Sequence, residues 1–364
     1  MRRDLECDAD SVVVTVADVE GTAYRRPGAK MLVRGDGTSV GAVTAGCLED
    51  SVTALSMEVL DAGGPRLVTF DLMEEDEDAW GLGLGCNGVI DVLLEPLDAS
   101  WRGPLDELDA GGSATVLTVV DSTAPNVPVG ARVYTDGSSR PREVAERDSI
   151  PGSVVESVAS VVSARHGRGG ATTVEVGTER GTVTVLVDGL VPVSTLLLSG
   201  SQPDVHPVAR VASAAGFEVA VHSPRGARGP EDFPHADRVE TGHPSTVGAS
   251  VEVPEHTYAV VMTHNLVDDR IAVEALLTET AVPYVGVMGP RDRFERLRDR
   301  SDVVAGADPD RIATPVGLDL GGGEPMEIAL SIVSEVLAVS NGREGGRLRD
   351  DEGPIHTRVG SERS

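Results

Sequence analysis

The residues of this sequence best suited to chemistry lie in two short stretches near its N-terminus. The segment RRPGAKM contains Arg25, Arg26 and Lys30, and Lys30 is the only lysine of the chain. The segment TAGCLED places Cys47 directly before an apolar helical pattern. Unpaired N–H groups at a helix start attract anions and lower the pKa of a thiol. The pattern indicates a reactive thiol beside an anion site; the alternative is a small buried cysteine and a surface lysine.

Cys86 lies in a second unusual environment, the glycine-rich run GLGLGCNG. Glycines let the backbone take positive φ and approach a ligand closely, with little bulk around the sulfur. A tight structural turn before the next strand explains the glycines equally well. Together with Cys7 and Cys47, this makes three cysteines without CxxC spacing, which predicts free thiols rather than a disulfide framework or a zinc site.

Short strands and one helix are expected to position these residues. The helix begins after Cys47, presents apolar residues on one face and stops at Gly63. The strands around it are predicted at residues 12–16, 30–33, 66–70 and 89–94.

Three sequence blocks recur in the same order in the following ninety or so residues. TVLTVVD and PVGARVYTDG echo VVVTVAD and RPGAKMLVRGDG, GGATTVEV echoes GGPRLVTF, and GTVTVLVDGL echoes GVIDVLLEPL. The recurrence predicts a β-rich α+β domain over residues 1–193 with two related halves, about 12–97 and 115–190. The second half has Arg132 in place of Lys30 and no cysteine. We therefore expect the chemistry in the first half and a scaffold in the second.

From Thr195 onward strands alternate with helices, so the fold class is α/β. This pattern predicts a Rossmann-like doubly wound parallel sheet over residues 194–340, followed by a polar tail at 341–364. Ligands bind such sheets at the carboxyl ends of the strands, and His264 falls at one of these ends. A triple glycine before the helix predicted from Pro325 offers a further helix start suited to an anion.

The dinucleotide fingerprint is incomplete in this second domain. It needs three glycines in the first strand-to-helix turn, and the turn GSQPD has Gln202 at the second position. The acidic ribose partner is also missing, because the second strand ends at His222 and Ser223. The sequence therefore argues against NAD(P) binding. An NAD(P)-dependent oxidoreductase with His264 as acid or base is kept as an alternative hypothesis.

The composition is strongly acidic. The chain has 31 basic and 59 acidic side chains, a formal net charge of −28, and arginine in almost every basic position. A hydrophobic content of 40% is enough for a core, so the acidic groups are expected on the surface of a salt-adapted protein. The charge argues against binding to nucleic acid or to an acidic membrane. No signal peptide or long apolar run is present, which predicts a soluble, cytoplasmic protein.

Several segments together resemble the XdhC/CoxI family, and they follow the family's order over most of residues 12–340. They are RRPGAKM, GCLE at Cys47, GLGLGC at Cys86, THN at His264, YVGVMGPRDR and GLDLGGGEPMEIALSI. Members of this family are accessory proteins of molybdenum hydroxylases such as xanthine dehydrogenase and carbon monoxide dehydrogenase. They join an N-terminal domain to a C-terminal Rossmann domain.

The resemblance implies a function in cofactor maturation. The family binds molybdenum cofactor, protects it while a cysteine desulfurase supplies its sulfido ligand, and helps to insert it into the hydroxylase apo-enzyme. Carried over by motif, the cofactor-binding residues are Arg25, Arg26, Lys30, Cys47, Glu49, Cys86 and His264. Cys47 is the candidate for contact with molybdenum or sulfur. Asn87 replaces a family glycine, which weakens the assignment of Cys86.

Three hypotheses follow for the function. The first is a chaperone that binds the cofactor and has no turnover of its own. The second is the NAD(P)-dependent oxidoreductase, and the third is a scaffold that recruits the hydroxylase without holding cofactor. A homodimer is expected only from the general abundance of two-fold oligomers.

Overall fold

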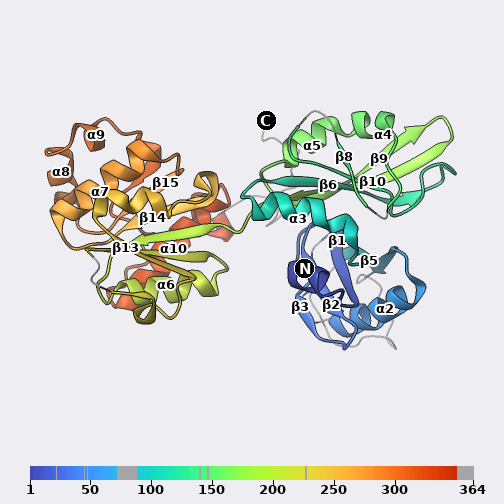
Figure 1. The fold of residues 1–364 in the computed structure, drawn as a ribbon, viewed down its shortest axis with the longest axis horizontal. Helices are drawn as coiled ribbons and strands as arrows, with labels where there is room; N and C mark the ends of the chain where they lie inside the picture. Colours follow the sequence, from blue (N-terminus) through green and yellow to red (C-terminus); the bar gives the residue numbers. More distant parts are fainter. Residues whose placement is uncertain are drawn as a thin grey trace. The chain divides into compact units, whose positions relative to one another are not determined.

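A computed structural model of the chain describes residues 1–21, 23–44, 46, 48–71, 88–138, 141–145, 147–225 and 228–350. The chain divides into two compact units, Met1–Pro192 and Val193–Ser364 (Figure 1). Each unit has its own sheets and its own hydrophobic core.

The N-terminal unit contains two five-stranded antiparallel sheets, with the strand orders β3-β2-β1-β5-β4 and β8-β7-β6-β10-β9. The first sheet consists of β1 (Ser11–Gly21), β2 (Lys30–Arg34), β3 (Ser39–Gly41), β4 (Arg66–Asp71) and β5 (Gly88–Pro96). The second consists of β6 (Ala114–Ser122), β7 (Arg132–Thr135), β8 (Arg142–Glu143), β9 (Gly170–Thr178) and β10 (Gly181–Leu190).

The two sheets are copies of one plan. Replacing each strand of the first sheet by its counterpart in the second gives the same strand order. The irregularities also agree: the register shift between β1 and β5 skips Ala17, and the shift between β6 and β10 skips Val120. These two residues occupy the same position in the blocks VVVTVAD and TVLTVVD. A bulge shared at one position confirms the predicted internal duplication.

The halves pack against each other through equivalent residues. Ala17 and Leu93 of the first half form one buried cluster with Val120, Leu186 and Ala171 of the second. Ala17 matches Val120 in the repeat, and Leu93 matches Leu186. Each half therefore removes the same apolar positions of the other from water, which joins the two sheets into one unit.

Helices cover the remaining face of each sheet. In the first half, Val52 and Val59 of α2 (Glu49–Ala62) pack on Val12, Val14 and Val16 of β1. In the second half, the matching face is covered by α4 (Gly152–Ser157) and α5 (Ala159–Arg165). The other described helices of this unit are α1 (Arg2–Glu6), η1 (Ala99–Trp101) and α3 (Arg102–Asp109).

The C-terminal unit is built on a six-stranded parallel sheet with the order β13-β12-β11-β14-β15-β16. Its strands are β11 (Thr195–Ser199), β12 (Glu218–Pro224), β13 (Arg238–Gly242), β14 (Thr257–Val261), β15 (Tyr284–Val287) and β16 (Ile312–Ala313). The order reverses between β11 and β14, which is the point where doubly wound sheets bind ligands. The predicted Rossmann-like sheet is confirmed.

Helices lie on both faces of this sheet. One face packs against α6 (Val205–Ala214) and α10 (Pro325–Ser340), and the other against α7 (Leu266–Glu279). The remaining helices are η2 (Pro230–Asp232), η3 (Pro244–Ser250), η4 (Pro254–His256), α8 (Arg291–Arg298), α9 (Asp302–Ala305), η5 (Pro309–Arg311) and η6 (Leu348–Asp350).

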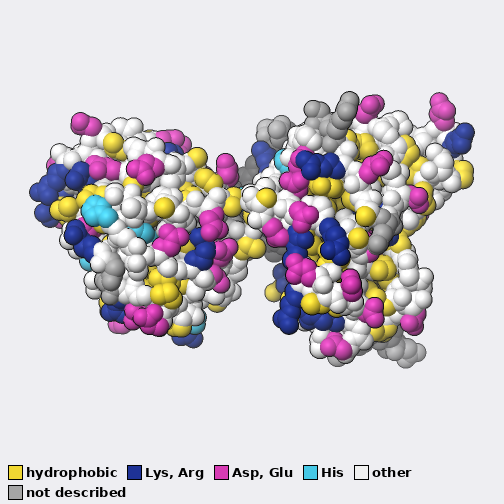
Figure 2. All heavy atoms as spheres, in the orientation of Figure 1, with side chains coloured by type: hydrophobic (Ala, Val, Ile, Leu, Met, Phe, Trp, Pro, Cys, Tyr) yellow, Lys and Arg dark blue, Asp and Glu magenta, His cyan; other side chains and the backbone are white. Residues whose placement is uncertain are grey.

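The described helices are short and the surface is charged. The longest of them, α10, has 16 residues, and none of the helices in the described ranges is long and apolar enough to cross a membrane. On the face shown in Figure 2, acidic side chains are scattered over both units.

Candidate functional site

The arginine loop, residues 23–29, lies between β1 and β2 at one end of the first sheet. Arg25 and Arg26 are exposed, and the Arg25 guanidinium lies 5.7 Å from the centre of the Tyr24 ring. Among the described residues, no carboxylate forms an ion pair with either arginine. Both guanidinium groups are therefore available to an anion from solution.

Strand pairing brings other motif-bearing segments to the same end of the sheet. Because Met31 pairs with Gly41, the arginine loop lies beside the chain that runs from β3 into α2. Gly21, at the end of β1, pairs with Gly88 at the start of β5. The described residues that flank the N-terminal motifs therefore lie toward the same end of this sheet, with Gly88 beside Gly21 and Gly41 beside Met31.

Two of the predicted site residues, Cys47 and Cys86, lie outside the described residues. Their assignment as cofactor contacts therefore stays a prediction. Cys7, the third cysteine, is exposed and carries a free thiol.

Lys30 links the two halves of the N-terminal unit. Its ammonium donates to Oδ2 of Asp188 over 2.5 Å and to the carbonyl oxygen of Gly28 over 3.2 Å. Asp188 lies on β10 of the second half, and its side chain is only 5% exposed. The single lysine of the chain is thus held by a buried carboxylate, and its assignment as a cofactor contact stays a prediction.

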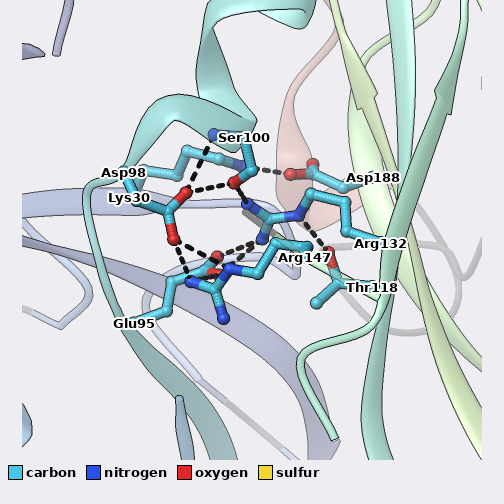
Figure 3. A network of polar contacts seen from close by, with 8 residues as sticks. All are labelled: Lys30, Glu95, Asp98, Ser100, Thr118, Arg132, Arg147 and Asp188. Carbon is cyan, nitrogen blue, oxygen red and sulfur yellow. Dashed lines mark hydrogen bonds and ion pairs between the residues drawn. The ribbon is translucent and has the colours of Figure 1, made fainter. Parts of the chain in front are cut away.

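Arg132 of the second half, the counterpart of Lys30, forms an ion pair with a carboxylate of the first half. Its Nη2 lies 2.5 Å from Oε2 of Glu95 on β5 of the first half (Figure 3). The repeat aligns Glu95 with Asp188. The basic residue of each half therefore forms an ion pair with the carboxylate at the matching position of the other half. Both side chains are almost completely buried, with exposed fractions of 1% and 2%.

Further residues accept hydrogen bonds from the remaining nitrogen atoms of the Arg132 guanidinium. Thr118 and Ser100 each accept a hydrogen bond from the Arg132 guanidinium, which also lies 4.6 Å from the Trp101 ring centre. Arg147 places its Nη2 2.7 Å from Asp98 and 3.7 Å from Glu95 (Figure 3). Two arginines therefore face two carboxylates, and the charges balance.

A hollow of about 530 Å³ lies beside this network rather than at the arginine loop. Its charged lining includes Asp98 and Arg147, together with Asp4, Asp8 and Asp10. None of the described residues predicted as cofactor ligands lines it. Its mixed charge gives no reason to assign it an anionic ligand.

Glu49 closes the turn that leads into α2. Its carboxylate accepts hydrogen bonds from Oγ1 of Thr44 over 2.6 Å and from the backbone N–H of Leu48 over 3.2 Å. Burial alone would raise the pKa of Glu49, but these hydrogen bonds outweigh it and hold the pKa below its ordinary value of 4.5. The carboxylate is ionised at neutral pH and shapes the turn that carries Cys47 in sequence.

His264 lies in the C-terminal unit, directly after β14, as predicted for a residue at the carboxyl edge of the sheet. Its backbone has φ of +61°, which is rare for a residue with a side chain, and the next residue, Asn265, caps α7 by accepting from Val267 and Asp268. The His264 Nε2 lies 2.6 Å from Oδ2 of Asp204 at the start of α6. This imidazole–carboxylate pair spans the point where the strand order reverses.

The first strand-to-helix turn of the C-terminal unit, which carries the incomplete dinucleotide fingerprint, is poorly suited to a pyrophosphate. A Cβ on Gly200 would lie 2.6 Å from the carbonyl oxygen of Met262, so this glycine is needed for close packing of the strands. Asp204 places a carboxylate at the start of α6, where a pyrophosphate would bind in a dinucleotide site. The negative charge works against that ligand.

The helix start after the triple glycine is already occupied. Glu327 accepts hydrogen bonds from the backbone N–H groups of Gly323 and Glu324 over 2.9 and 3.0 Å. This carboxylate takes the position that a bound anion would have at the start of α10. The expected anion site there is therefore filled by the helix's own side chain.

The most important residue that the motifs missed is Asp188. The repeat contained the signal for it, since Asp188 stands where the first half has Glu95. Asp204 is a second such residue, and no pattern connected it with His264. Within the described ranges, no cluster of histidine, cysteine and carboxylate side chains could hold a metal ion.

Known proteins resemble this chain over most of its length. A crystal structure of a xanthine dehydrogenase from Bacillus halodurans matches with a TM-score of 0.73 and 30% identity, covering 92% of this chain and 93% of that one. The chain belongs to the XdhC and CoxI family. Residues 7–71 match the XdhC and CoxI family model, and residues 196–336 match that of the XdhC Rossmann domain.

Two curated relatives of the XdhC and CoxI family are similar along nearly the whole chain. One, a Bacillus subtilis protein described as a probable subunit of xanthine dehydrogenase, is 28% identical over 338 residues, covering 92% of this chain and 94% of the relative. The molybdenum cofactor insertion chaperone PaoD of Escherichia coli is 22% identical over 334 residues, covering 90% of this chain and 83% of the relative.

Proposed function

We propose that this chain is an accessory protein that binds molybdenum cofactor and assists its insertion into a hydroxylase of the xanthine dehydrogenase type. The observation that carries the proposal is the similarity to a molybdenum cofactor insertion chaperone over 90% of the chain. The relative described as a probable xanthine dehydrogenase subunit supports the class of partner.

The arginine loop suits the cargo. The cofactor carries a phosphate and a dithiolene, both anionic, and arginine forms strong charge-assisted hydrogen bonds with such groups. Arg25 and Arg26 are exposed and unpaired among the described residues. The cargo would dock at this loop, with the thiol of Cys47 as a soft contact for molybdenum or as a temporary carrier of sulfur. A cysteine desulfurase would then supply the sulfur.

The test is the molybdenum and pterin content of purified protein. Wild type, Cys47→Ala and Cys7→Ala are made in a host with an active cofactor pathway and purified in molar KCl. Cofactor on wild type and Cys7→Ala, with loss in Cys47→Ala, supports the proposal. Cys7 is the matched control because it is an exposed free thiol. Absence of pterin from all three proteins would refute cofactor binding.

A second candidate function is favoured by the His264–Asp204 pair at the switch point of the Rossmann sheet. An imidazole held by a carboxylate is suited to proton transfer, as an NAD(P)-dependent oxidoreductase requires. The carboxylate of Asp204 at the start of α6 opposes a pyrophosphate. Titration with NADH and NADPH, followed by the fluorescence of the reduced nicotinamide, tests this function: no binding removes the oxidoreductase, and saturable binding lost in His264→Ala supports it.

The scaffold hypothesis makes a different prediction for the same variants. If the chain only recruits the hydroxylase, Cys47→Ala would activate the apo-enzyme as well as wild type does. If it carries cofactor, activation by Cys47→Ala falls together with its pterin content.

A further inference from the structure

The internal duplication creates two equivalent ion pairs between the halves of the N-terminal unit, Arg132–Glu95 and Lys30–Asp188. We call the first pair, with the adjacent Arg147 and Asp98, the filled copy, and the second pair, with the nearby Arg165, the open copy. Only the pairs match by the repeat, because Arg147 and Arg165 both belong to the second half. Strand pairing shows the equivalence, because Thr15 lies opposite Lys30 and Thr118 lies opposite Arg132 at matching positions of the repeat.

Each copy is bordered by a glycine that packs on the other half. A Cβ on Gly28 would lie 2.9 Å from the backbone nitrogen of Ala171, and a Cβ on Gly130 would lie 2.6 Å from Cγ of Pro65. Both glycines have positive φ, and both donate to the preceding strand of their own half over 2.8 Å. The backbone frame of the two copies is therefore the same, and the side chains differ.

In the filled copy every charge has a partner. Arg132 bonds to Glu95, and Arg147 bonds to Asp98 and approaches Glu95. Two cations face two carboxylates in a buried setting. Such a network is stable because no charge is left without an acceptor or donor.

In the open copy the cations outnumber the carboxylates. Arg165, at the end of α5, is only 9% exposed, yet among the described residues none accepts a hydrogen bond from its guanidinium or forms an ion pair with it. Oδ2 of Asp188 accepts a hydrogen bond from Lys30, while Oδ1 is buried and has no hydrogen-bond partner. Burial lowers the pKa of Arg165, and the nearby Asp188 raises it in part. Two cations thus share one carboxylate.

The open copy lies directly against the arginine loop. Gly170 lies between Arg165 and the arginine loop. A Cβ built on Gly170 would lie 3.1 Å from Nη1 of Arg165 and 3.9 Å from the carbonyl oxygen of Pro27. The Ala171 backbone nitrogen also donates to Pro27 over 3.2 Å. The exposed Arg25 and Arg26 directly precede Pro27. In a chain with a net charge of −28, this is a local concentration of positive charge.

We propose that the open copy is a phosphate-binding site, in which Arg165 of the second half and the arginine loop of the first hold a phosphate or phosphomonoester. Arg165 supplies a planar donor pair on a mostly buried side chain, and Arg25 and Arg26 supply donors at the surface. The ligand provides the second negative charge that Asp188 alone does not supply to Lys30 and Arg165. That the ligand is the phosphate of molybdenum cofactor rests on the proposed function; phosphate binding itself does not.

Inorganic phosphate is the probe for the first test, on protein made without molybdenum cofactor. The thermal midpoint of wild type, Arg165→Met and Arg168→Met is measured against phosphate concentration at constant ionic strength. Arg168 is the matched control, because it is exposed and lies three residues after Arg165. We expect the midpoint of wild type and of Arg168→Met to rise with phosphate, and the affinity of Arg165→Met to fall about tenfold or more.

The same variants show whether Arg165 has a purely structural role. Without phosphate, Arg165→Met should unfold at the same temperature as wild type or higher, because the variant replaces a mostly buried side chain that donates no hydrogen bond to a described residue with an apolar one. A lower midpoint without phosphate, or an unchanged response to phosphate, would overturn the proposal.

A second arm identifies the source of the phosphate. Protein from a host that makes the cofactor is assayed for pterin in Arg165→Met and Arg168→Met. Loss of pterin in Arg165→Met alone assigns the site to the cofactor's phosphate. Normal pterin together with a lost phosphate response assigns it to free phosphate or another phosphorylated ligand. A lack of pterin on wild type counts against the proposed function and leaves the phosphate result intact.

Discussion

The Lys30 ammonium lies 2.5 Å from the Asp188 carboxylate, and the two residues come from different halves of the N-terminal unit. Arg132 and Glu95 repeat this relationship in reverse at the equivalent positions. These two reciprocal ion pairs connect the halves and fix which residues of one half lie opposite which residues of the other. The halves therefore depend on each other for charge neutrality as well as for apolar burial.

Removing either cation should destabilise the N-terminal unit, and Arg132→Met should cost more than Lys30→Met. Arg132→Met leaves Glu95 buried and uncompensated, which is expected to lower the free energy of unfolding by about 3–5 kcal/mol. Lys30→Met should cost about 2 kcal/mol, because Lys30 is partly exposed and Arg165 stays near Asp188. Urea unfolding in molar KCl, followed by tryptophan fluorescence, measures both; Trp80 and Trp101 both belong to this unit.

A triple variant provides the control for these values. Lys30→Met combined with Asp188→Leu and Arg165→Met removes the carboxylate together with both cations beside it, and should recover most of the stability lost in Lys30→Met. Equal stability of wild type and Lys30→Met would contradict a structural role for the ion pair.

The backbone of His264 predicts a difference between two substitutions that both remove the imidazole. Its φ of +61° is accessible to glycine without strain, whereas alanine keeps a Cβ that disfavours it. His264→Gly should therefore be more stable than His264→Ala by about 1 kcal/mol. Thermal unfolding monitored by circular dichroism tests this. Alanine matching or exceeding glycine would show that the loop relaxes out of the positive-φ region.

His222 should make the stability of the C-terminal unit depend on pH. Burial lowers the pKa of His222 below its ordinary value of 6.5; the Glu240 carboxylate counteracts this, and His243 adds to it. The unfolded chain therefore binds a proton below pH 6.5 that the folded chain does not bind. Stability is unaffected above pH 6.5 and falls as the pH drops below it, by at most about 1.4 kcal/mol per pH unit.

The measurement compares thermal midpoints of wild type and His222→Gln across pH 5.5–7.5. The midpoint of wild type should fall faster toward low pH than that of the variant, since the variant has no imidazole to protonate. Parallel curves would show that His222 does not contribute to the pH dependence.

The repeat and the Rossmann pattern were visible in the sequence because each depends on buried apolar strands with a regular period. β1 and β6 are hydrophobic on both faces, since each packs on a helix on one side and on the other half of the unit on the other. Burial on both faces gives these strands a clear hydrophobic run in the sequence. The edge strands β3 and β8 are short and exposed, so the sequence has no such run there, and neither was predicted.

Residue type alone did not show how the two halves contribute to these polar contacts. Lys30 is unique in composition, which suggested a ligand contact, but the structure engages it with Asp188. The second half was expected only to complete the scaffold, yet it supplies Asp188 and Arg165 next to the arginine loop. Which cation lacks an acceptor depends on tertiary packing between segments more than 130 residues apart, and no local pattern records it.

Glu49 should stabilise the start of α2. Glu49→Ala removes the acceptor for Thr44 and Leu48 and is expected to lower the free energy of unfolding by about 1 kcal/mol. Glu58→Ala on the same helix is the control, because Glu58 forms only an exposed ion pair with Arg66 and should cost less. Urea unfolding followed by tryptophan fluorescence measures both. A larger loss in Glu58→Ala would contradict the stabilisation of this turn by Glu49.

Salt should stabilise the protein through its charge. With 59 acidic and 31 basic side chains, the compact state at low ionic strength is under self-repulsion, which the unfolded chain relieves by expanding. Raising KCl from about 0.1 M to 1 M shortens the Debye length from about 10 Å to 3 Å and screens this repulsion. The thermal midpoint should therefore rise with KCl, and it should rise less at pH 5.5, where the carboxylates are closer to protonation. A midpoint independent of KCl at pH 7.5 would show that the acidic side chains are placed too far apart, or too close to arginines, for their repulsion to affect folding.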